Sequence, residues 1–213
     1  QRLSRGLGDV YKRQLDSYPD TFKATTLPNR CMQVSNFYDS MDGIEGESII
    51  GSEDCLYLNI YLSEKAYKSK EKLPVVFWIH GGGNTWGYSA SNIFTSGDFI
   101  LDHDVILVTT NYRLGPFGWF AYSGLNQDSE NPLDSTANFG TLDIIKSLEW
   151  VNKYISFFNG DPENITIFGE SAGARNVISL MSSPLSKDLF QRVISQSGYL
   201  GSDSLEYSEN NER

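Results

Sequence analysis

A serine set between glycines is the residue of this chain best suited to covalent chemistry. Ser171 lies in GESAG, which follows the apolar run ITIFG and precedes a helix-like stretch at 172–182. A strand, a sharp turn and a helix in this order are typical of a nucleophile elbow, which presents a serine hydroxyl to a carbonyl carbon. The tight turn needs almost no side chain two positions before and after the serine, and Gly169 and Gly173 meet that need. The alternative, a serine that caps an ordinary helix, is disfavoured by the strand in front of it.

A second glycine motif supplies what a serine nucleophile needs beside it. HGGG at 80–83 directly follows the apolar run PVVFWI. Glycines let the backbone approach a substrate closely, so the Gly82 and Gly83 N–H groups are the expected donors to an oxyanion. The elbow adds the Ala172 N–H at the start of the following helix. A glycine-rich turn without function is the alternative for HGGG alone, but the two motifs in this chain order reinforce each other.

The chain has two histidines, and neither follows the serine. In sites of this kind the expected chain order is serine, then an acid, then a histidine. We therefore expect His80 to orient the glycine loop and His103 to lie at a surface or helix end. Without a base the Ser171 hydroxyl is a poor nucleophile near neutral pH. The sequence therefore contains the expected nucleophile and oxyanion donors of a catalytic site, but not its acid and histidine.

The elements that position these motifs alternate between strands and helices. The helix at 141–157 carries an apolar stripe at spacings of three and four, formed by Leu142, Ile145, Leu148, Val151 and Ile155. A second helix is expected at 172–182, ending before Pro184. The expected strands are 56–62, 74–80, 105–112, 165–169 and 192–197. This alternation predicts an α/β fold with a mostly parallel, doubly wound sheet.

Composition restricts the function classes. The 213 residues are 39% hydrophobic and 21% charged, which indicates one globular domain or the larger part of one. A net charge of −10 argues against nucleic acid or an anionic membrane surface as partner, because both need clustered Lys and Arg. No apolar run approaches the ~20 residues of a membrane span. The sequence leaves the oligomeric state open.

The two cysteines, Cys31 and Cys55, allow a disulfide, two buried thiols or part of a metal site. The metal site is disfavoured because only His80 and His103 are left to join them and no spacing fits zinc. We predict no metal and no cofactor. The cysteine pairing stays open at this point.

Five segments in order resemble the type-B carboxylesterase and cholinesterase-like family, over about Tyr18 to Tyr199. They are SEDCLYLNIY at 52–61, HGGG at 80–83, NYRLGPFGW at 111–119, FNGDPENITIFGESAG at 158–173 and SPLSKDLFQRVISQSG at 183–198. The resemblance implies an α/β-hydrolase fold that is incomplete here, with the C-terminal part missing. Residues 15–213 would then be the N-terminal portion of a single domain. Residues 1–14 resemble translated adaptor sequence and are expected to be a non-native extension.

The resemblance also implies roles for individual residues. Ser171 would be the nucleophile, and the oxyanion hole would be formed by Gly82, Gly83 and Ala172. Cys31 and Cys55 match the first disulfide of the family, and Glu170 would face the active site, although a solvated turn carboxylate is the simpler reading. Three residues depart from the family pattern: Ser63, Asn159 and Arg175.

The function that the resemblance implies is hydrolysis of a small-molecule carboxylic ester through a serine acyl-enzyme. The acid and the histidine would lie outside this chain, so the 213 residues alone are expected to be inactive. The alternative is a non-catalytic cholinesterase-like binding or adhesion domain. The matched disulfide favours a secreted or periplasmic protein. Trp86 and Tyr88, which follow the glycine loop, line the substrate pocket, lie at its rim or pack in the core.

Overall fold

The computed structural model describes residues 24–41, 43–44, 46–91, 103–120, 122, 131–201 and 207. The expected non-native extension, 1–14, lies outside them.

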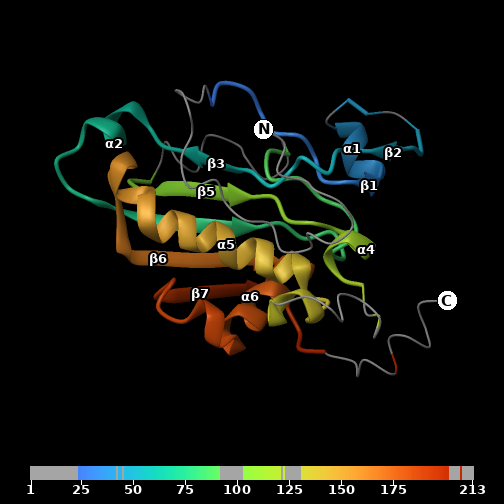
Figure 1. The fold of residues 1–213 in the computed structure, drawn as a ribbon. Coiled ribbons are helices and arrows are strands. Elements are labelled where there is room, and N and C mark those ends of the chain that lie inside the picture. The colour runs from blue at the N-terminus through green and yellow to red at the C-terminus, as the bar shows by residue number, and fades with distance from the viewer. Residues whose placement is uncertain are drawn as a thin grey trace.

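A five-stranded sheet forms the centre of the molecule (Figure 1). Its strands, in chain order, are β3 (Leu58–Tyr61), β4 (Leu73–Ile79), β5 (Ile106–Thr110), β6 (Gly160–Glu170) and β7 (Arg192–Gln196). They lie in the order β3-β5-β4-β6-β7. The last four run parallel, and only β3 is antiparallel to its neighbour β5. The predicted mostly parallel sheet is therefore confirmed.

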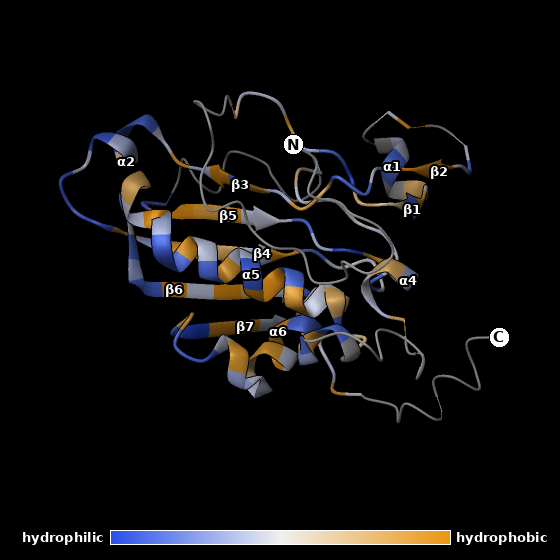
Figure 2. Cartoon of the chain, viewed as in Figure 1, coloured by the Kyte–Doolittle hydropathy of each residue, from blue (hydrophilic) through white to orange (hydrophobic). Residues whose placement is uncertain are grey.

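The strands form where β-branched and aromatic residues run together. All five residues of β5 are buried, as expected for a central parallel strand covered on both faces. The sheet is correspondingly hydrophobic along its middle strands in Figure 2. β6 begins five residues earlier than the sequence predicted, because Gly160 pairs with Leu73 ahead of a shift in register. A polar stretch thus joins the strand by pairing, not by hydrophobic pattern.

Two of the described helices cover one face of the sheet. They are α5 (Phe139–Tyr154), which continues as a 3-10 turn over Ile155–Phe158, and α6 (Ala172–Ser182). The predicted stripe on α5 is buried, with Leu148 and Val151 at 0% exposure. It packs with α6 and alternate residues of β4, such as Phe77, in one core cluster. The opposite face carries a smaller cluster built on Trp78 and Leu107.

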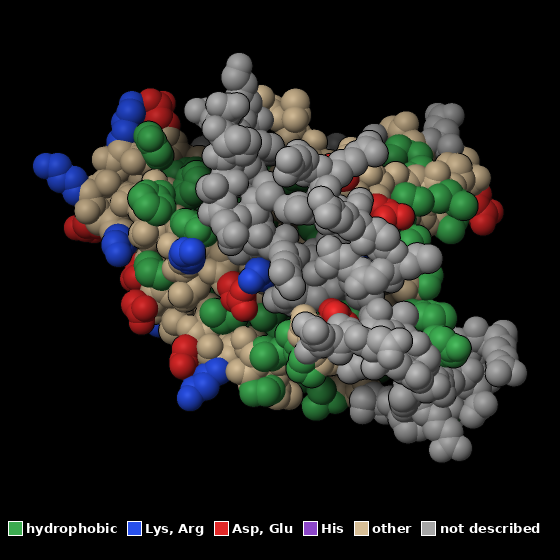
Figure 3. Space-filling view, viewed as in Figure 1, with side chains coloured by type: hydrophobic (Ala, Val, Ile, Leu, Met, Phe, Trp, Pro, Cys, Tyr) green, Lys and Arg blue, Asp and Glu red, His purple; other side chains and the backbone are tan. Residues whose placement is uncertain are grey.

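Short elements complete the described chain. They are β1 (Gln33–Val34), α1 (Phe37–Met41), β2 (Ile49–Ile50), α2 (Glu64–Lys68), α4 (Gly115–Gly118) and 3-10 turns at Pro132–Ser135 and Pro184–Ser186. β1 and β2 pair as a separate two-stranded sheet. Charged side chains gather at the end of the molecule that carries α2 (Figure 3). No described helix is both long enough and apolar enough to cross a bilayer.

The two cysteines form a disulfide. Cys31 and Cys55 are 3% and 1% exposed and lie at the edge of the main core. The bond ties the segment before β1 to the segment before β3, so it links the small sheet to the large one. This resolves the pairing that the residues alone left open.

Asn159, one of the three departures from the family pattern, has a structural reason. Its φ of 69° lies in the left-handed region, which asparagine tolerates better than most residues. Its side-chain Nδ2 donates to the carbonyls of Ala66, Ser69 and Glu71, at 3.0, 3.1 and 3.1 Å. Asn159 therefore fixes the end of α2 and the turn that leads into β4.

Candidate active site

The two glycine motifs lie side by side at the carboxyl ends of adjacent strands. β4 and β6 are parallel neighbours, with Ile79 paired to Gly169. Parallel strands end at the same edge of a sheet, so HGGG after β4 and GESAG at the end of β6 emerge together. In Figure 1 this edge is the one turned toward α4.

The chain turns sharply at Ser171. Its backbone has φ 54° and ψ −120°, a conformation that costs a non-glycine residue energy and persists only where the surroundings impose it. A Cβ on Gly169 would lie 2.6 Å from the Gly173 carbonyl carbon, and one on Gly173 would lie 2.1 Å from the Ile79 oxygen. Both glycines are therefore required by close backbone approach, as the sequence predicted.

The glycine loop lies directly against this turn. Gly82 and Gly83 have φ of 98° and 63°, which side chains rarely adopt. The Gly82 carbonyl accepts from the Thr85 and Trp86 N–H groups, at 3.0 and 3.1 Å, which closes the loop into a turn. A Cβ placed on Gly81 would lie 3.4 Å from the Ser171 Cβ. The loop and the serine thus border the same small space.

The start of α6 borders the same space. Ala172 is its first residue, and the first N–H groups of a helix have no acceptor within it. Ser171 is held in place by its own N–H, which donates to the Gln196 carbonyl at 2.9 Å. Ser171 is partly exposed and Glu170 is exposed. The Glu170 carboxylate lies beside the loop, with Oε2 3.3 Å from a Cβ built on Gly81.

His80 is buried beneath the loop. It is 1% exposed and stacks on the Tyr112 ring, with the ring centres 4.3 Å apart. Its Nδ1 lies 2.9 Å from the Gly81 carbonyl, so this nitrogen carries the hydrogen. Burial lowers the pKa of His80 from 6.5 to about 4, and the hydrogen bond to Gly81 offsets only part of that shift. The ring is therefore neutral near pH 7 and packs against the loop.

His103 lies at the opposite edge of the sheet. It is exposed and precedes β5, whose carboxyl end is at the edge where Ser171 lies. A strand of five residues spans about 16 Å. His103 is therefore far from Ser171. It lies at the surface, as the sequence predicted.

A buried hydrogen-bond network behind the loop was not foreseen from the sequence. Asn176 on α6, 3% exposed, donates from Nδ2 to Asn84 Oδ1 at 2.9 Å and accepts from Asn84 Nδ2 at 3.3 Å. Its amide also interacts with the Tyr112 hydroxyl, which partly offsets the effect of burial in raising the pKa of Tyr112. That hydroxyl in turn donates to the His80 carbonyl at 2.5 Å. No local pattern marks these residues, because 92 positions separate the two asparagines.

Two further candidates from the sequence take different places. Tyr88 is 7% exposed, its hydroxyl donates to the Pro28 carbonyl at 2.6 Å, and Arg30 lies 4.1 Å from its ring centre. Tyr88 therefore packs in the core. Trp86 is partly exposed next to Gly82. Arg175, the large residue inside the elbow helix, lies 4.6 Å over the Tyr199 ring.

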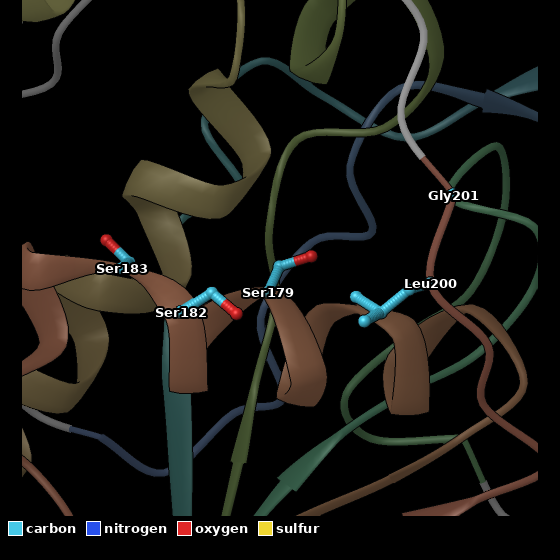
Figure 4. A pocket seen from close by; sticks show the side chains of 5 residues that line it. All are labelled: Ser179, Ser182, Ser183, Leu200 and Gly201. Carbon is cyan, nitrogen blue, oxygen red and sulfur yellow. The ribbon is translucent and has the colours of Figure 1, made fainter.

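A hollow beside α6 is separate from these groups. Leu200 extends toward the helix across it (Figure 4). Its lining consists of Ser179, Ser182, Ser183, Leu200 and Gly201. It includes neither Ser171 nor the glycine loop, so its position does not fit a substrate of this serine.

Known proteins resemble this chain over most of its length. The model of the Carboxylesterase family matches residues 12–212. Para-nitrobenzyl esterase of Bacillus subtilis (strain 168) is 38% identical over 181 residues, which cover 85% of this chain and 35% of that protein. Carboxylesterase 5A of Mus musculus is 40% identical over 191 residues, which cover 88% of this chain and 31% of that protein. The chain thus spans about a third of the length of these relatives.

Solved structures agree with the sequence relatives. A PNB esterase structure matches with a TM-score of 0.72 at 35% identity, over 85% of this chain and 35% of that chain. A thermophilic PNB esterase matches with a TM-score of 0.67 at 37% identity, over 79% of this chain and 32% of that chain. These likenesses confirm the α/β-hydrolase fold. The chain belongs to the carboxylesterase family.

Proposed function

We propose that the full-length protein hydrolyses small carboxylic esters through an acyl-enzyme on Ser171. The observation that carries the proposal is the strained backbone of Ser171 at the end of β6, with the glycine loop against it. Strain of this kind persists at sites where it serves a mechanism. The names of the relatives, para-nitrobenzyl esterase and carboxylesterase, support the same reaction class.

In the proposed reaction, the Ser171 oxygen attacks the ester carbonyl carbon, and its proton passes to a general base. The carbonyl oxygen becomes an oxyanion, which accepts hydrogen bonds from the N–H groups of Gly82, Gly83 and Ala172. The intermediate collapses, the bond to the alcohol oxygen breaks, and the base returns the proton to the departing alcohol. Water then releases the acid from Ser171 by the same steps.

We further propose that neither histidine of this chain is the base. The His80 ring packs on Tyr112 with Nδ1 at the Gly81 carbonyl, and its low pKa makes it a weak proton acceptor. His103 precedes β5, at the far edge of the sheet. The acid and the histidine would therefore come from outside residues 1–213, and this piece alone would not turn over.

The test is hydrolysis of a short-chain p-nitrophenyl ester by the full-length protein and by S171A. We expect S171A to lose activity about 10⁴-fold or more, because the other groups of such a site act only through the nucleophile. S179A is the matched control. It removes a hydroxyl from α6, the helix that Ser171 precedes, but at an exposed position. Equal rates in S171A and the unsubstituted protein would refute the proposal.

A fluorophosphonate probe separates the esterase from the adhesion alternative. The probe phosphonylates an activated serine, so it should label the full-length protein and not S171A. A full-length protein that stays unlabelled and inactive would favour the non-catalytic binding domain.

The remaining proposals concern the whole protein. We propose that residues 15–213 are the N-terminal portion of one esterase domain and that residues 1–14 are a non-native extension. Secretion or periplasmic export is supported by the disulfide between Cys31 and Cys55, because such bonds persist in oxidising compartments. The proposed substrate is a small ester, with no nucleic acid partner.

A further inference from the structure

We propose that Asn84 and Asn176 are positioning residues, whose paired amides hold the glycine loop at a fixed distance from Ser171 and Ala172. This inference rests on the proposed esterase function, because it requires that the backbone N–H groups of that loop and of Ala172 donate to the same oxyanion. Neither asparagine is assigned contact with the substrate. Their role is to set the geometry of the donors.

The loop needs such support because the residues that carry the N–H donors, Gly82 and Gly83, have no side chains to hold them in place. Both adopt left-handed backbone conformations. Its internal hydrogen bonds, from the Thr85 and Trp86 N–H groups to the Gly82 carbonyl, close the turn but do not attach it to α6. The attachment to the helix must therefore come from residues that flank the glycines.

Asn176 supplies that attachment at both flanks of the loop. On one side its amide pairs with Asn84, the residue directly after Gly83. On the other side it interacts with Tyr112, whose hydroxyl donates to the carbonyl of His80. Asn176 lies on α6, five residues after the nucleophile, so one side chain links the helix that starts at Ala172 to both ends of the loop.

The network fixes the orientation of the amide. The Tyr112 hydroxyl gives its hydrogen to the His80 carbonyl, so toward Asn176 it can act only as an acceptor. Asn176 Nδ2 then has one hydrogen for Tyr112 and one for Asn84 Oδ1, while its Oδ1 accepts from Asn84 Nδ2. At 3% exposure, water cannot readily replace these partners. The Asn84 backbone is held as well, because its carbonyl accepts from the Gly115 N–H at 2.7 Å.

The expected consequence is a loss of transition-state stabilisation. A catalytic group displaced by about 1 Å can cost about a hundredfold in rate. We therefore expect N84A and N176A each to lower kcat about ten- to a hundredfold, with KM changed less than about threefold, since the oxyanion forms only during the reaction. The double variant N84A/N176A should lose no more than about threefold beyond the worse single variant, because both substitutions break one pair.

The experiment measures kcat, KM and the inhibition constant of a trifluoromethyl ketone with the full-length protein. The serine oxygen adds to the ketone carbon of this inhibitor, its proton passes to the general base, and the ketone oxygen becomes the oxyanion of a tetrahedral adduct. Its inhibition constant should rise in proportion to the loss in kcat/KM, whereas weakened folding alone would leave the two unrelated. N59A is the control. Asn59 also makes side-chain hydrogen bonds, to Ser89 and Thr109, but it lies on β3, which β5 separates from β4 and the glycine loop.

The outcomes are distinguishable. If N84A and N176A keep kcat within about threefold of the unsubstituted protein while their unfolding midpoints fall as in N59A, the asparagines are only structural and the inference is wrong. If kcat and the inhibition constant change together in both variants and not in N59A, the inference stands. Failure of the proposed esterase function would look different, because the unsubstituted protein would itself be inactive, and that result would overturn both.

Discussion

The ion pair between Arg113 and Asp143 gives the sharpest prediction on stability. Arg113 follows β5, and Asp143 lies in the first turns of α5. The guanidinium donates to both carboxylate oxygens at 2.7 Å, and the Arg113 backbone N–H donates to Oδ2 at 3.0 Å. The side chains are 12% and 4% exposed. The pair therefore joins the loop after β5 to the helix that covers the sheet.

The substitution D143N keeps the shape of the side chain but removes its charge and turns an amide toward the guanidinium. Breaking a buried pair by removing one partner costs about 3–5 kcal/mol, mainly because the other charge stays buried and unpaired. The control is E149Q on the same helix. Glu149 pairs with Lys146 at 2.7 Å, but these side chains are 41% and 28% exposed. A pair so exposed contributes about 0–1 kcal/mol.

Urea unfolding of the full-length protein, followed by tryptophan fluorescence, measures both free energies of unfolding. We expect D143N to lower the urea midpoint strongly and E149Q to leave it nearly unchanged. The slope of the unfolding free energy against urea concentration should be the same in both variants. The apolar double variant R113M/D143L should recover part of the loss, because no charge is left buried. A D143N loss within about 1 kcal/mol of that of E149Q would refute the argument from burial.

Two further predictions follow from the loop and the elbow. Because burial lowers the pKa of His80 from 6.5 to about 4, its neutral ring stabilises the fold fully above pH 6.5, and that contribution is lost as pH falls toward 4, by about 3 kcal/mol in total. The unfolding free energy of H80N should therefore fall less between about pH 7 and pH 4.5 than that of the unsubstituted protein, and parallel curves would contradict the burial argument. In G173A the new methyl group would meet the Ile79 oxygen at 2.1 Å, so we expect lost ester hydrolysis and about 1–3 kcal/mol of destabilisation by urea unfolding. G201A, where the nearest atom is a Tyr199 ring carbon at 3.7 Å, should change neither activity nor stability; similar losses in the two variants would show that the close approach at Gly173 is not the cause.

The sequence by itself determined the elements and the local geometry of the elbow. The helix at 172–182 has the predicted bounds, and the stripe on α5 is buried as its spacing indicates. Gly169 and Gly173 were predictable because a tight turn excludes side chains whatever surrounds it. The glycine loop was predictable for the same reason. Such features depend on neighbours within a few residues, which the sequence displays directly.

Only the tertiary structure decided which distant residues meet. It paired Asn84 with Asn176, placed the Tyr112 hydroxyl on the His80 carbonyl and lengthened β6 by pairing Gly160 with Leu73. It also gave the Asn159 side chain three carbonyl partners around α2. The physical reason is that a polar side chain can pair with any donor or acceptor that folding brings near. Its partner is set by the strand order and by the packing of α6, which no local pattern of residues records.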